Sequence, residues 1–400
     1  MRTAQVTNAV ASAARGSARW PLARLEQLHA GLLEEQQRAW RRLLRWPRLV
    51  TAALDAPTGA TPYEVVLQMG TLSLRRYRSA RPSPDAPPLL FCYALVNRPY
   101  ILDLQADKSV VRRYLDAGFD VYLIDWGVPS HADRHLTLEH YVERLLGTVV
   151  DFVLGQQRAQ RLHLLGYCMG GTLAALYTAL HPEQIATLTL LAAPIDFGGR
   201  ESLLNLWTDA RCFDVDAFID AYGNCPAPFL QACFLNTKPV QNLLTKNLAL
   251  YDQMEDQRFL ANYFALERWV NDNIPVAGET FREFVKKLYQ ENQLVRGEFE
   301  LAGRRVDLAQ ITCPLLLLTA RSDHLVPPSS TLGLRAHVGS LDVEEQTIEA
   351  GHVGLVVGGK AHATFWPAAV RWLAARAATS AGIPRTSENG NPRGMESHGH

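Results

Sequence analysis

Short apolar runs alternate with longer amphipathic segments through the middle of the chain. Continuous apolar runs of this length predict strands that are buried on both faces of a parallel sheet. They fall at residues 89–96, 120–124, 161–165, 186–191 and 315–319. The segments between them have the pattern of helices, at residues 109–117, 138–154 and 172–180. This alternation predicts an α/β protein with a mostly parallel sheet and helices on both faces.

The pattern extends at both ends of this region and is interrupted once. Residues 61–78 alternate partly and predict one or two strands ahead of the parallel ones, and residues 343–348 and 366–378 predict a last strand and a last helix. Residues 197–305 are rich in aromatic residues and favour helices. An insertion of this kind between sheet strands is typical of a cap, or lid, over an active site. Its aromatics either pack the cap or contact substrate, and packing is favoured.

The predicted domains follow from these patterns. The core comprises residues 61–196 and 306–378, and the cap comprises residues 197–305. Residues 1–60 form an N-terminal extension in which residues 22–33 have helical spacing, and this amphipathic helix either packs on the body or docks a partner helix. Residues 379–400 are polar and predict a disordered tail.

A nucleophile elbow is predicted where the strand at 161–165 meets the next helix. Gly166, Cys168 and Gly170 form a Gly-x-Cys-x-Gly pattern, in which the central residue is more often serine. A strand that turns at once into a helix leaves no room for side chains beside the nucleophile, so both glycines have a steric role. A cysteine at such a position is otherwise a small buried hydrophobe. The three glycines, Gly171 included, favour the nucleophile.

Two further residues complete a candidate triad. A thiol nucleophile needs a base and a group that orients the base, and in an elbow fold these follow in the order acid, then histidine, after later strands. Asp323 follows the strand at 315–319, and His352 follows it by 29 residues (352 − 323), past the next strand. We therefore predict catalytic Cys168, Asp323 and His352. His324 is the rival base, but as the immediate neighbour of Asp323 it is expected to point another way, and it either supports another residue of the site or lies on the substrate side.

The oxyanion hole is predicted from backbone positions. The N–H of Met169 directly follows the nucleophile, and a second N–H comes from the loop after the strand that begins at Leu89. Val96 is the candidate there, with Asn97 as the alternative.

Composition narrows the class of protein. Forty basic and forty acidic residues cancel, so neither nucleic acid nor an anionic membrane is indicated as a partner. The six cysteines lack the spacing of a zinc site and indicate free thiols in a reducing compartment. No apolar run reaches the roughly 18 residues that a membrane helix needs, and no signal peptide is evident. We expect a cytoplasmic protein, and the sequence implies no metal and no organic cofactor.

The choice of cysteine indicates the type of reaction. Attack of a thiolate on a thioester is close to balanced, and the acyl group stays activated for transfer. Cys168 therefore suggests acyl transfer from a thioester, with an alcohol as the final acceptor.

Five collinear segments resemble the polyhydroxyalkanoate synthases. They are LLFCYALVNRPYILDLQ (89–105), VYLIDWG (121–127), GYCMGG (166–171), DHLVPP (323–328) and GH (351–352). The resemblance spans residues 60 to 375, and its most similar form is the short catalytic subunit of the two-component class III enzymes.

The resemblance implies both a fold and an activity. It implies an α/β-hydrolase core under a cap that polymerises (R)-3-hydroxyacyl-CoA, typically 3-hydroxybutyryl-CoA, and releases CoA. Cys168 would carry the growing polyester chain as a thioester, His352 would deprotonate it, and Asp323 would help to activate the 3-hydroxyl. A homodimer, a second non-catalytic synthase subunit of the class III or class IV type and association with polyester granules are implied as well. Residues 20–50 are the candidate docking helix for that subunit.

Two other functions fit parts of the same pattern. A thioesterase or polyester hydrolase of this fold needs the same triad but admits water, and it would release free acid. A non-enzymatic granule-associated scaffold would not need Cys168, Asp323 and His352.

Overall fold

The computed structural model describes residues 59–83, 87–237 and 246–380. The chain divides into two compact units, one of residues 1–56 and 245–264 and the other of residues 57–244 and 265–400. Nearly all of the predicted N-terminal extension (1–60), with its helix at 22–33, lies outside the described residues. So does the predicted tail (379–400), apart from its first two residues.

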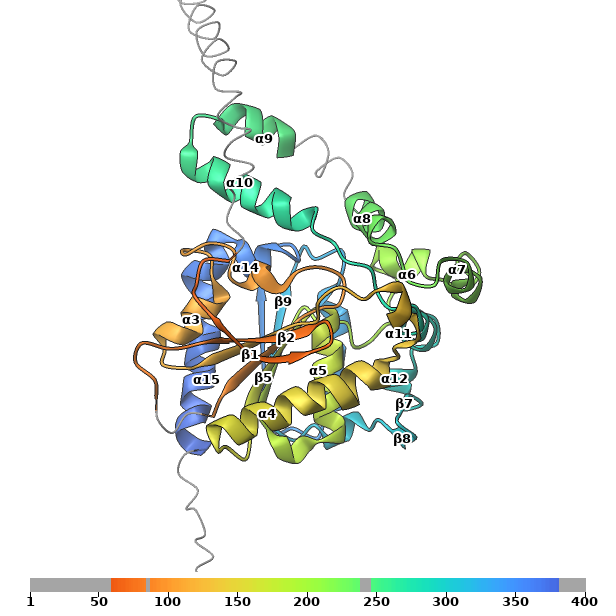
Figure 1. The fold of residues 1–400 in the computed structure, drawn as a ribbon, viewed down its shortest axis with the longest axis horizontal. Coiled ribbons are helices and arrows are strands. Elements are labelled where there is room, and N and C mark those ends of the chain that lie inside the picture. The colour runs from red at the N-terminus through yellow and green to blue at the C-terminus, as the bar shows by residue number, and fades with distance from the viewer. Residues whose placement is uncertain (1–58, 84–86, 238–245, 381–400) are drawn as a thin grey trace, which may run out of the picture. The chain divides into compact units, whose positions relative to one another are not determined.

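The second unit is built on one eight-stranded sheet (Figure 1). Its strands are β1 (Glu64–Met69), β2 (Leu72–Tyr77), β3 (Leu89–Cys92), β4 (Val121–Asp125), β5 (Leu162–Tyr167), β6 (Ile185–Leu191), β9 (Leu315–Ala320) and β10 (Val343–Ile348). They lie in the order β1-β2-β4-β3-β5-β6-β9-β10. All neighbours from β4 to β10 are parallel, whereas β1–β2 and β2–β4 are antiparallel. The predicted mostly parallel sheet is confirmed.

Helices cover both faces of the sheet, as predicted (Figure 1). Helices α3 (Val110–Asp116) and α15 (Trp366–Ser380) pack together on one face. On the other face lie α5 (Met169–Leu180) and α4 (Gly147–Gln157), the latter continuing from a π-helical turn, η3 (His140–Leu146). Burial of the central strands explains their composition, since every residue of β3, β4, β5, β6 and β9 is buried.

Short helical turns make up most of the remaining core connections. They are η1 (Pro99–Leu102), η2 (His131–His135), η4 (Pro182–Gln184), η7 (Leu308–Gln310), α13 (Pro328–Leu332), η8 (Gly333–Ala336), α14 (Gly354–Val357) and η9 (Ala361–Phe365).

Strand β3 is shorter than the sequence predicts. The prediction covers residues 89–96, but β3 ends at Cys92, and Tyr93, Ala94 and Leu95 continue as a buried loop. The indole N–H of Trp126 donates to the Tyr93 carbonyl oxygen at 2.8 Å, so this backbone group is bound by a side chain instead of a neighbouring strand. The apolar run therefore marks burial, and only its first half marks a strand.

The segment between β6 and β9 is mainly helical. It contains α6 (Leu203–Trp207), α7 (Val215–Tyr222), α8 (Ala227–Asn236), α9 (Lys246–Gln253), α10 (Gln257–Val270), α11 (Gly278–Glu283), η6 (Phe284–Gln290), α12 (Gln293–Arg296) and the short strands β7 (Glu300–Leu301) and β8 (Arg304–Arg305). Helix α9 and the part of α10 up to Phe264 belong to the first unit. In the second unit, Phe218 packs against Phe213, Phe229 and Phe281 with ring centroids 4.8 to 6.0 Å apart.

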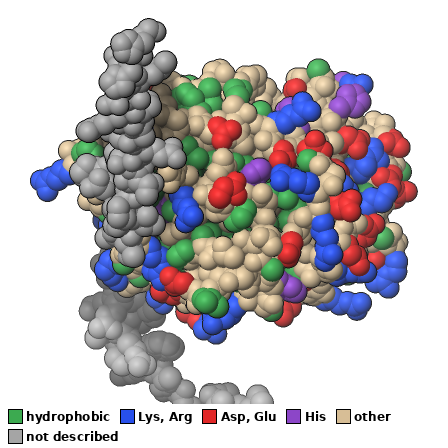
Figure 2. Space-filling view, turned by 90° about the horizontal axis from the view of Figure 1, so that it is seen from below, with side chains coloured by type: hydrophobic (Ala, Val, Ile, Leu, Met, Phe, Trp, Pro, Cys, Tyr) green, Lys and Arg blue, Asp and Glu red, His purple; other side chains and the backbone are tan. Residues whose placement is uncertain are grey.

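The surface carries charges of both signs. On the face shown in Figure 2, basic and acidic side chains are interspersed with apolar and neutral ones. This distribution accompanies the formal net charge of zero for the whole sequence. Within the described ranges, no helix has both the length and the apolar character needed to cross a membrane.

Candidate active site

The sharp turn predicted around Cys168 is present at the carboxyl end of β5. Strand β5 ends at Tyr167 and helix α5 begins at Met169, so Cys168 alone makes the turn. Its backbone angles are φ 54° and ψ −130°, outside the regions that non-glycine residues normally occupy. The Cys168 N–H donates to the Leu191 carbonyl oxygen of β6 at 2.9 Å, which fixes the turn to the sheet. Strain of this kind persists only where the surrounding structure enforces it.

The two glycines of the pattern allow this turn because they have no side chain. The neighbouring atoms leave no space for a Cβ at either position. A Cβ atom on Gly166 would lie 2.4 Å from the Cα of Gly171, and one on Gly170 would lie 2.4 Å from the carbonyl oxygen of Cys92. Both distances are well inside van der Waals contact. The close approach at Gly170 brings the end of β3 against the first turn of α5.

Asp323 and His352 meet at the ends of β9 and β10. The Nδ1 of His352 lies 2.7 Å from Oδ2 of Asp323. The other carboxylate oxygen, Oδ1, accepts the backbone N–H groups of Leu325 and Val326, both at 2.9 Å. The Asp323 side chain is wholly buried and that of His352 is 10% exposed. The carboxylate is therefore fixed by three donors, and one of them is the imidazole.

Cys168 lies close enough to the same imidazole for its charge to act on the pKa of His352. Since Nδ1 is taken by Asp323, Nε2 is the nitrogen left for the thiol. Burial alone would lower the pKa of His352, but the charges of Asp323 and Cys168 and the hydrogen bond to Asp323 hold that pKa well above its ordinary value. The structure thus brings together the three residues that the sequence singled out, with His352 hydrogen-bonded to Asp323 and within electrostatic reach of Cys168.

Tyr167 contacts the imidazole from a direction that sequence patterns do not indicate. Its ring stacks on that of His352 with centroids 5.1 Å apart and an interplanar angle of 23°. Its hydroxyl donates to the His352 carbonyl oxygen at 3.3 Å. The sequence shows only that Tyr167 directly precedes Cys168, because an aromatic residue at a strand end gives no sign of the loop that will reach its face.

The two backbone groups predicted for an oxyanion hole lie on segments that touch. As the first residue of α5, Met169 has an N–H without an acceptor inside the helix. Val96 lies on the loop after β3, and its carbonyl oxygen accepts the N–H of Ile274 at 3.2 Å. Beside it, Asn97 forms a bridge with Asn273. The choice between the N–H groups of Val96 and Asn97 stays a prediction.

The imidazole of His324 takes no part in the described contacts of Asp323 and His352. His324 is exposed, and its carbonyl oxygen accepts from the Ser202 hydroxyl at 3.2 Å. In the part of the chain that the structure describes, no hydrogen bond or ring contact links its imidazole to the triad. Its predicted place on the substrate side stays a prediction.

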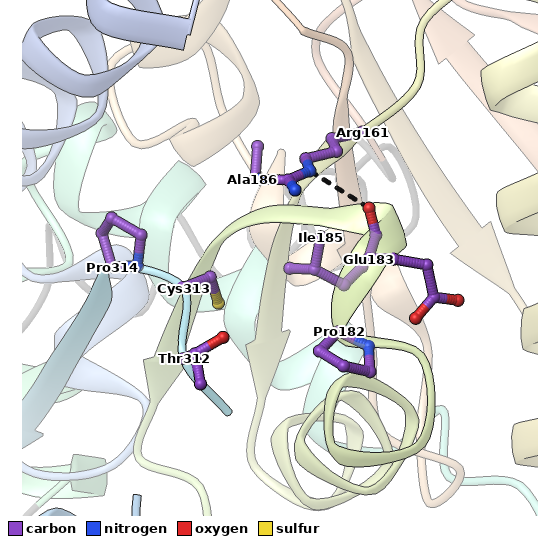
Figure 3. Close-up of a pocket in the computed structure, with 8 residues that line it drawn as sticks. All are labelled: Arg161, Pro182, Glu183, Ile185, Ala186, Thr312, Cys313 and Pro314. Atoms are coloured by element: carbon purple, nitrogen blue, oxygen red, sulfur yellow. Dashed lines mark hydrogen bonds between the residues drawn. The ribbon is translucent and has the colours of Figure 1, made fainter. Parts of the chain in front are cut away.

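A separate pocket lies at the amino ends of the central strands (Figure 3). It has a volume of about 320 Å³ and is lined by Arg161, Pro182, Glu183, Ile185, Ala186, Thr312, Cys313 and Pro314. These residues lie at or just before the starts of β5, β6 and β9, whereas the candidate triad lies at the ends of strands. The Arg161 side chain donates to the Glu183 carbonyl oxygen at 3.1 Å, so its guanidinium already has a partner here.

No metal centre is formed by side chains of the described residues, since no three His, Cys, Asp or Glu side chains gather in a way able to hold an ion there.

The family comparison identifies the class to which this fold belongs. The family described as the alpha/beta hydrolase fold matches residues 87–358. Two solved structures also align at low similarity. The monoacylglycerol lipase of Paleococcus ferrophilus has 15% identity and a TM-score of 0.45, covering 76% of this chain and 99% of its own. Est1E of Butyrivibrio proteoclasticus has 13% identity and a TM-score of 0.47, covering 80% and 99%. The fold is that of an α/β-hydrolase.

Curated relatives narrow the family further. A protein of Haloferax mediterranei named poly(3-hydroxyalkanoate) polymerase subunit PhaC is 40% identical over 368 residues, which are 90% of this chain and 75% of that protein. The proteins of the same name from Synechocystis sp. and Allochromatium vinosum are 40% and 39% identical, and the alignments cover 86% and 89% of their lengths. The chain belongs to the family of poly(3-hydroxyalkanoate) polymerase PhaC subunits.

Proposed function

We propose that this chain is an acyltransferase that polymerises (R)-3-hydroxyacyl-CoA into polyhydroxyalkanoate with release of CoA, through an acyl thioester on Cys168. The observation that carries the proposal is the meeting of Cys168, His352 and Asp323 at the strand ends of an α/β-hydrolase fold, with His352 hydrogen-bonded to Asp323 and within electrostatic reach of Cys168. Family membership supports it, because the relatives' names specify a poly(3-hydroxyalkanoate) polymerase.

In the first step the acyl group moves from CoA to the enzyme. His352 Nε2 takes the thiol proton of Cys168, and the thiolate attacks the carbonyl carbon of the acyl-CoA thioester. The bond from that carbon to the CoA sulfur then breaks, and the imidazolium returns its proton to the departing thiolate. The raised pKa of His352 suits this role, since it keeps the proton available near neutral pH.

The oxyanion formed in this step needs hydrogen-bond donors. The N–H of Met169 and the N–H of Val96 or Asn97 are proposed for it, together with the positive end of the α5 dipole. The strained turn at Cys168 supports this, because it holds the sulfur at the start of that helix.

In elongation, the 3-hydroxyl of another hydroxyacyl-CoA attacks the acyl thioester. A C–O ester bond forms, the bond from the carbonyl carbon to Cys168 sulfur breaks, and the hydroxyl proton reaches that sulfur by way of His352. The lengthened acyl-CoA can then acylate Cys168 again. Both oxygens of Asp323 are already bound to N–H donors and its side chain is wholly buried, so we propose that it acts through His352 without touching the hydroxyl itself.

The remaining parts of the proposal concern assembly. Residues 197–305 are proposed as the cap over this site. The support is that the second unit's part of this segment is mainly helical. A homodimer, a second non-catalytic subunit and attachment to polyester granules follow from the family resemblance. The candidate docking segment, residues 20–50, lies outside the described residues, and its deletion without loss of partner binding would end that idea.

The decisive experiment measures CoA release and polymer mass from 3-hydroxybutyryl-CoA, with and without a candidate partner subunit. Wild type should release CoA and accumulate polymer in proportion, while Cys168→Ala should do neither. Cys212→Ala is the matched control, because Cys212 is an exposed cysteine that makes no part of the triad. Release of CoA with free acid and no polymer would indicate a hydrolase, and unchanged activity in Cys168→Ala would refute the assignment of the nucleophile.

A further inference from the structure

The side chain of Tyr167 is held on three sides. It is 2% exposed, and it belongs to the last residue of β5, directly before Cys168. One ring face stacks on His352, and the hydroxyl donates to the carbonyl oxygen of that same histidine. A third contact comes from Tyr93, whose ring lies 5.7 Å away at an angle of 50°. A side chain fixed in this way can in turn fix the imidazole that lies on it.

Tyr93 carries the contact on to the loop after β3. Its hydroxyl donates to Oδ1 of Asn97 at 2.7 Å, and its own carbonyl oxygen accepts the indole N–H of Trp126. Asn97 and its neighbour Val96 are the candidates for the second oxyanion donor. The two tyrosines therefore connect the base of the proposed triad to the loop that is proposed to stabilise the oxyanion.

The stacked geometry also has an electrostatic consequence. The face of an aromatic ring carries negative charge density, and it attracts a cation that lies within about 6 Å of the ring centroid. The imidazole centroid lies 5.1 Å from that of Tyr167, nearly parallel to it. The ring consequently favours the protonated form of His352 over the neutral form. Burial raises the pKa of the Tyr167 phenol well above its ordinary value, so the ring itself stays neutral.

We propose that Tyr167 is a positioning residue that orients the His352 imidazole toward Cys168 and stabilises the imidazolium through the face of its ring. This inference rests on the proposed function, since it assigns Tyr167 a task in the same Cys168–His352 pair. It predicts that the electrostatic character of the ring at position 167, and not only its size, sets the pH range in which the acyl group is transferred.

The test replaces only the electrostatics of the ring. Tyr167→Phe keeps the negative face and loses the hydroxyl, whereas pentafluorophenylalanine at position 167 has nearly the same shape but a positive face. The measured quantity is first-turnover CoA release from 3-hydroxybutyryl-CoA as a function of pH. Tyr167→Phe should keep the alkaline limb of the profile close to that of wild type. The fluorinated ring should move that limb to lower pH by about half a pH unit, because the imidazolium loses a favourable contact.

A matched control exists on helix α5. Tyr177 is also 2% exposed and stacks on a histidine, His181, at 4.7 Å and 29°, but neither belongs to the triad. Phenylalanine and pentafluorophenylalanine at position 177 should give identical pH profiles. Thermal unfolding of all four proteins checks that they are folded, and the small difference in ring size makes folding of the fluorinated variants comparable.

The outcomes separate this inference from the proposed function. If phenylalanine and its fluorinated form at position 167 share one alkaline limb while Cys168→Ala is inactive, the role of Tyr167 is refuted and the triad stands. A shift of equal size in both would assign the effect to the lost hydroxyl and would equally overturn the role of the ring face. If Cys168→Ala retains CoA release, the proposed function fails, and this inference fails with it.

Discussion

At the scale of single residues, the site contains close contacts that leave no space for additional side-chain atoms. The glycine at position 170 is the clearest example, because the carbonyl groups of Cys92 and Tyr93 lie where its side chain would be. These are backbone atoms, which cannot move aside as the end of a flexible side chain can. The end of β3 and the start of α5 therefore fit only if position 170 has no Cβ.

We expect Gly170→Ala to destabilise the protein and to abolish CoA release. Overpacking in a tight core costs about 1 to 3 kcal/mol, and the backbone contacts here place the change at the upper end. Gly155→Ala, in helix α4 with nothing within 4 Å of the added Cβ, is the control and should stabilise the protein by about 0.5 to 1 kcal/mol. Chemical denaturation of both variants gives the comparison, and an equally stable Gly170→Ala would contradict it.

The second prediction at this scale concerns Asp323. In Asp323→Asn the charge that helps to hold the pKa of His352 well above its ordinary value is lost, so that pKa should fall. A raised pKa keeps the imidazolium present to higher pH, and CoA departure is lost as pH rises through it. The alkaline limb should accordingly move to lower pH, and the rate should drop by about 10⁴, as for loss of the correct tautomer in other triads.

Asp342→Asn is the control for Asp323→Asn. Asp342 is exposed and is paired with Arg376, at 2.6 Å, outside the triad. Its variant should keep the wild-type pH profile, measured by the same CoA assay. Similar pH profiles for the two variants would argue against a specific role of Asp323.

The sequence predicts the positions of those candidate site residues that depend on topology. Cys168, Asp323 and His352 each follow a strand, and the carboxyl ends of parallel strands share one edge of a sheet, so strand prediction brings them together. Tyr167 escaped it because its role depends on the direction of a ring and the path of a loop 185 residues away. The oxyanion donors depend on the path of the loop after β3, which the apolar run misrepresented as strand.

At the scale of elements, strand β5 ends directly before the proposed nucleophile, Cys168, and contains a histidine, His163. His163 is fully buried in β5, where its Nδ1 lies 2.9 Å from the Thr187 hydroxyl of β6. Burial lowers the pKa of His163 to about 3. The folded state therefore favours the neutral form of the His163 imidazole.

This histidine should make the fold sensitive to acid. Its pKa is about 3 in the folded protein and about 6.5 in the unfolded chain, so the unfolded chain binds the proton first as pH falls. Between pH 7 and pH 5 the free energy of unfolding should drop by about 2 kcal/mol from this group alone.

The non-titrating variant His163→Leu tests that origin. It should lose about 2 kcal/mol less than wild type over the same pH interval, whatever its stability at pH 7. Urea denaturation at both pH values measures this difference. Parallel losses in the two proteins would show that other groups cause the acid sensitivity.

The bounds of helices and strands were predicted well wherever the spacing of apolar residues matches the buried positions of the element. Strands β4, β5, β6, β9 and β10 begin and end within two residues of the predicted ranges. The π-helical turn η3 ahead of α4 was not predicted, since the shift from one helical hydrogen-bond pattern to another leaves the spacing of apolar residues nearly unchanged. The nine-residue helix predicted at 172–180 begins three residues earlier, at Met169, because the elbow requires the helix to start immediately after Cys168.

At the scale of the whole molecule, the second unit contains the sheet and the candidate site. The first described residues of this unit are held by hydrogen bonds. Ala60 and Thr61 donate their backbone N–H groups to Oδ2 of Asp103 at 3.1 and 2.8 Å. The Asp103 carboxylate is buried and also accepts the hydroxyl of Ser109. These contacts fix the start of the second unit to the segment before α3.

Deletion of residues 1–56 should therefore leave the core folded. We expect its cooperative unfolding transition to remain, with the melting temperature changed by no more than about 4 °C, and Cys168 should still be acylated by 3-hydroxybutyryl-CoA in a single turnover. Scanning calorimetry and mass spectrometry of the Cys168 peptide are the measurements. A non-cooperative transition would show that the sheet depends on residues that precede Pro57.

One outermost strand of the sheet, β10, carries charged side chains at exposed positions. Strand β10 exposes Glu344 and Glu345, the latter paired with Arg335 at 2.9 Å. An extended peptide that paired with β10 would remove water from these carboxylates, and this desolvation makes the pairing unfavourable. At high local protein concentration, the sheets of neighbouring copies should therefore not pair edge to edge through β10.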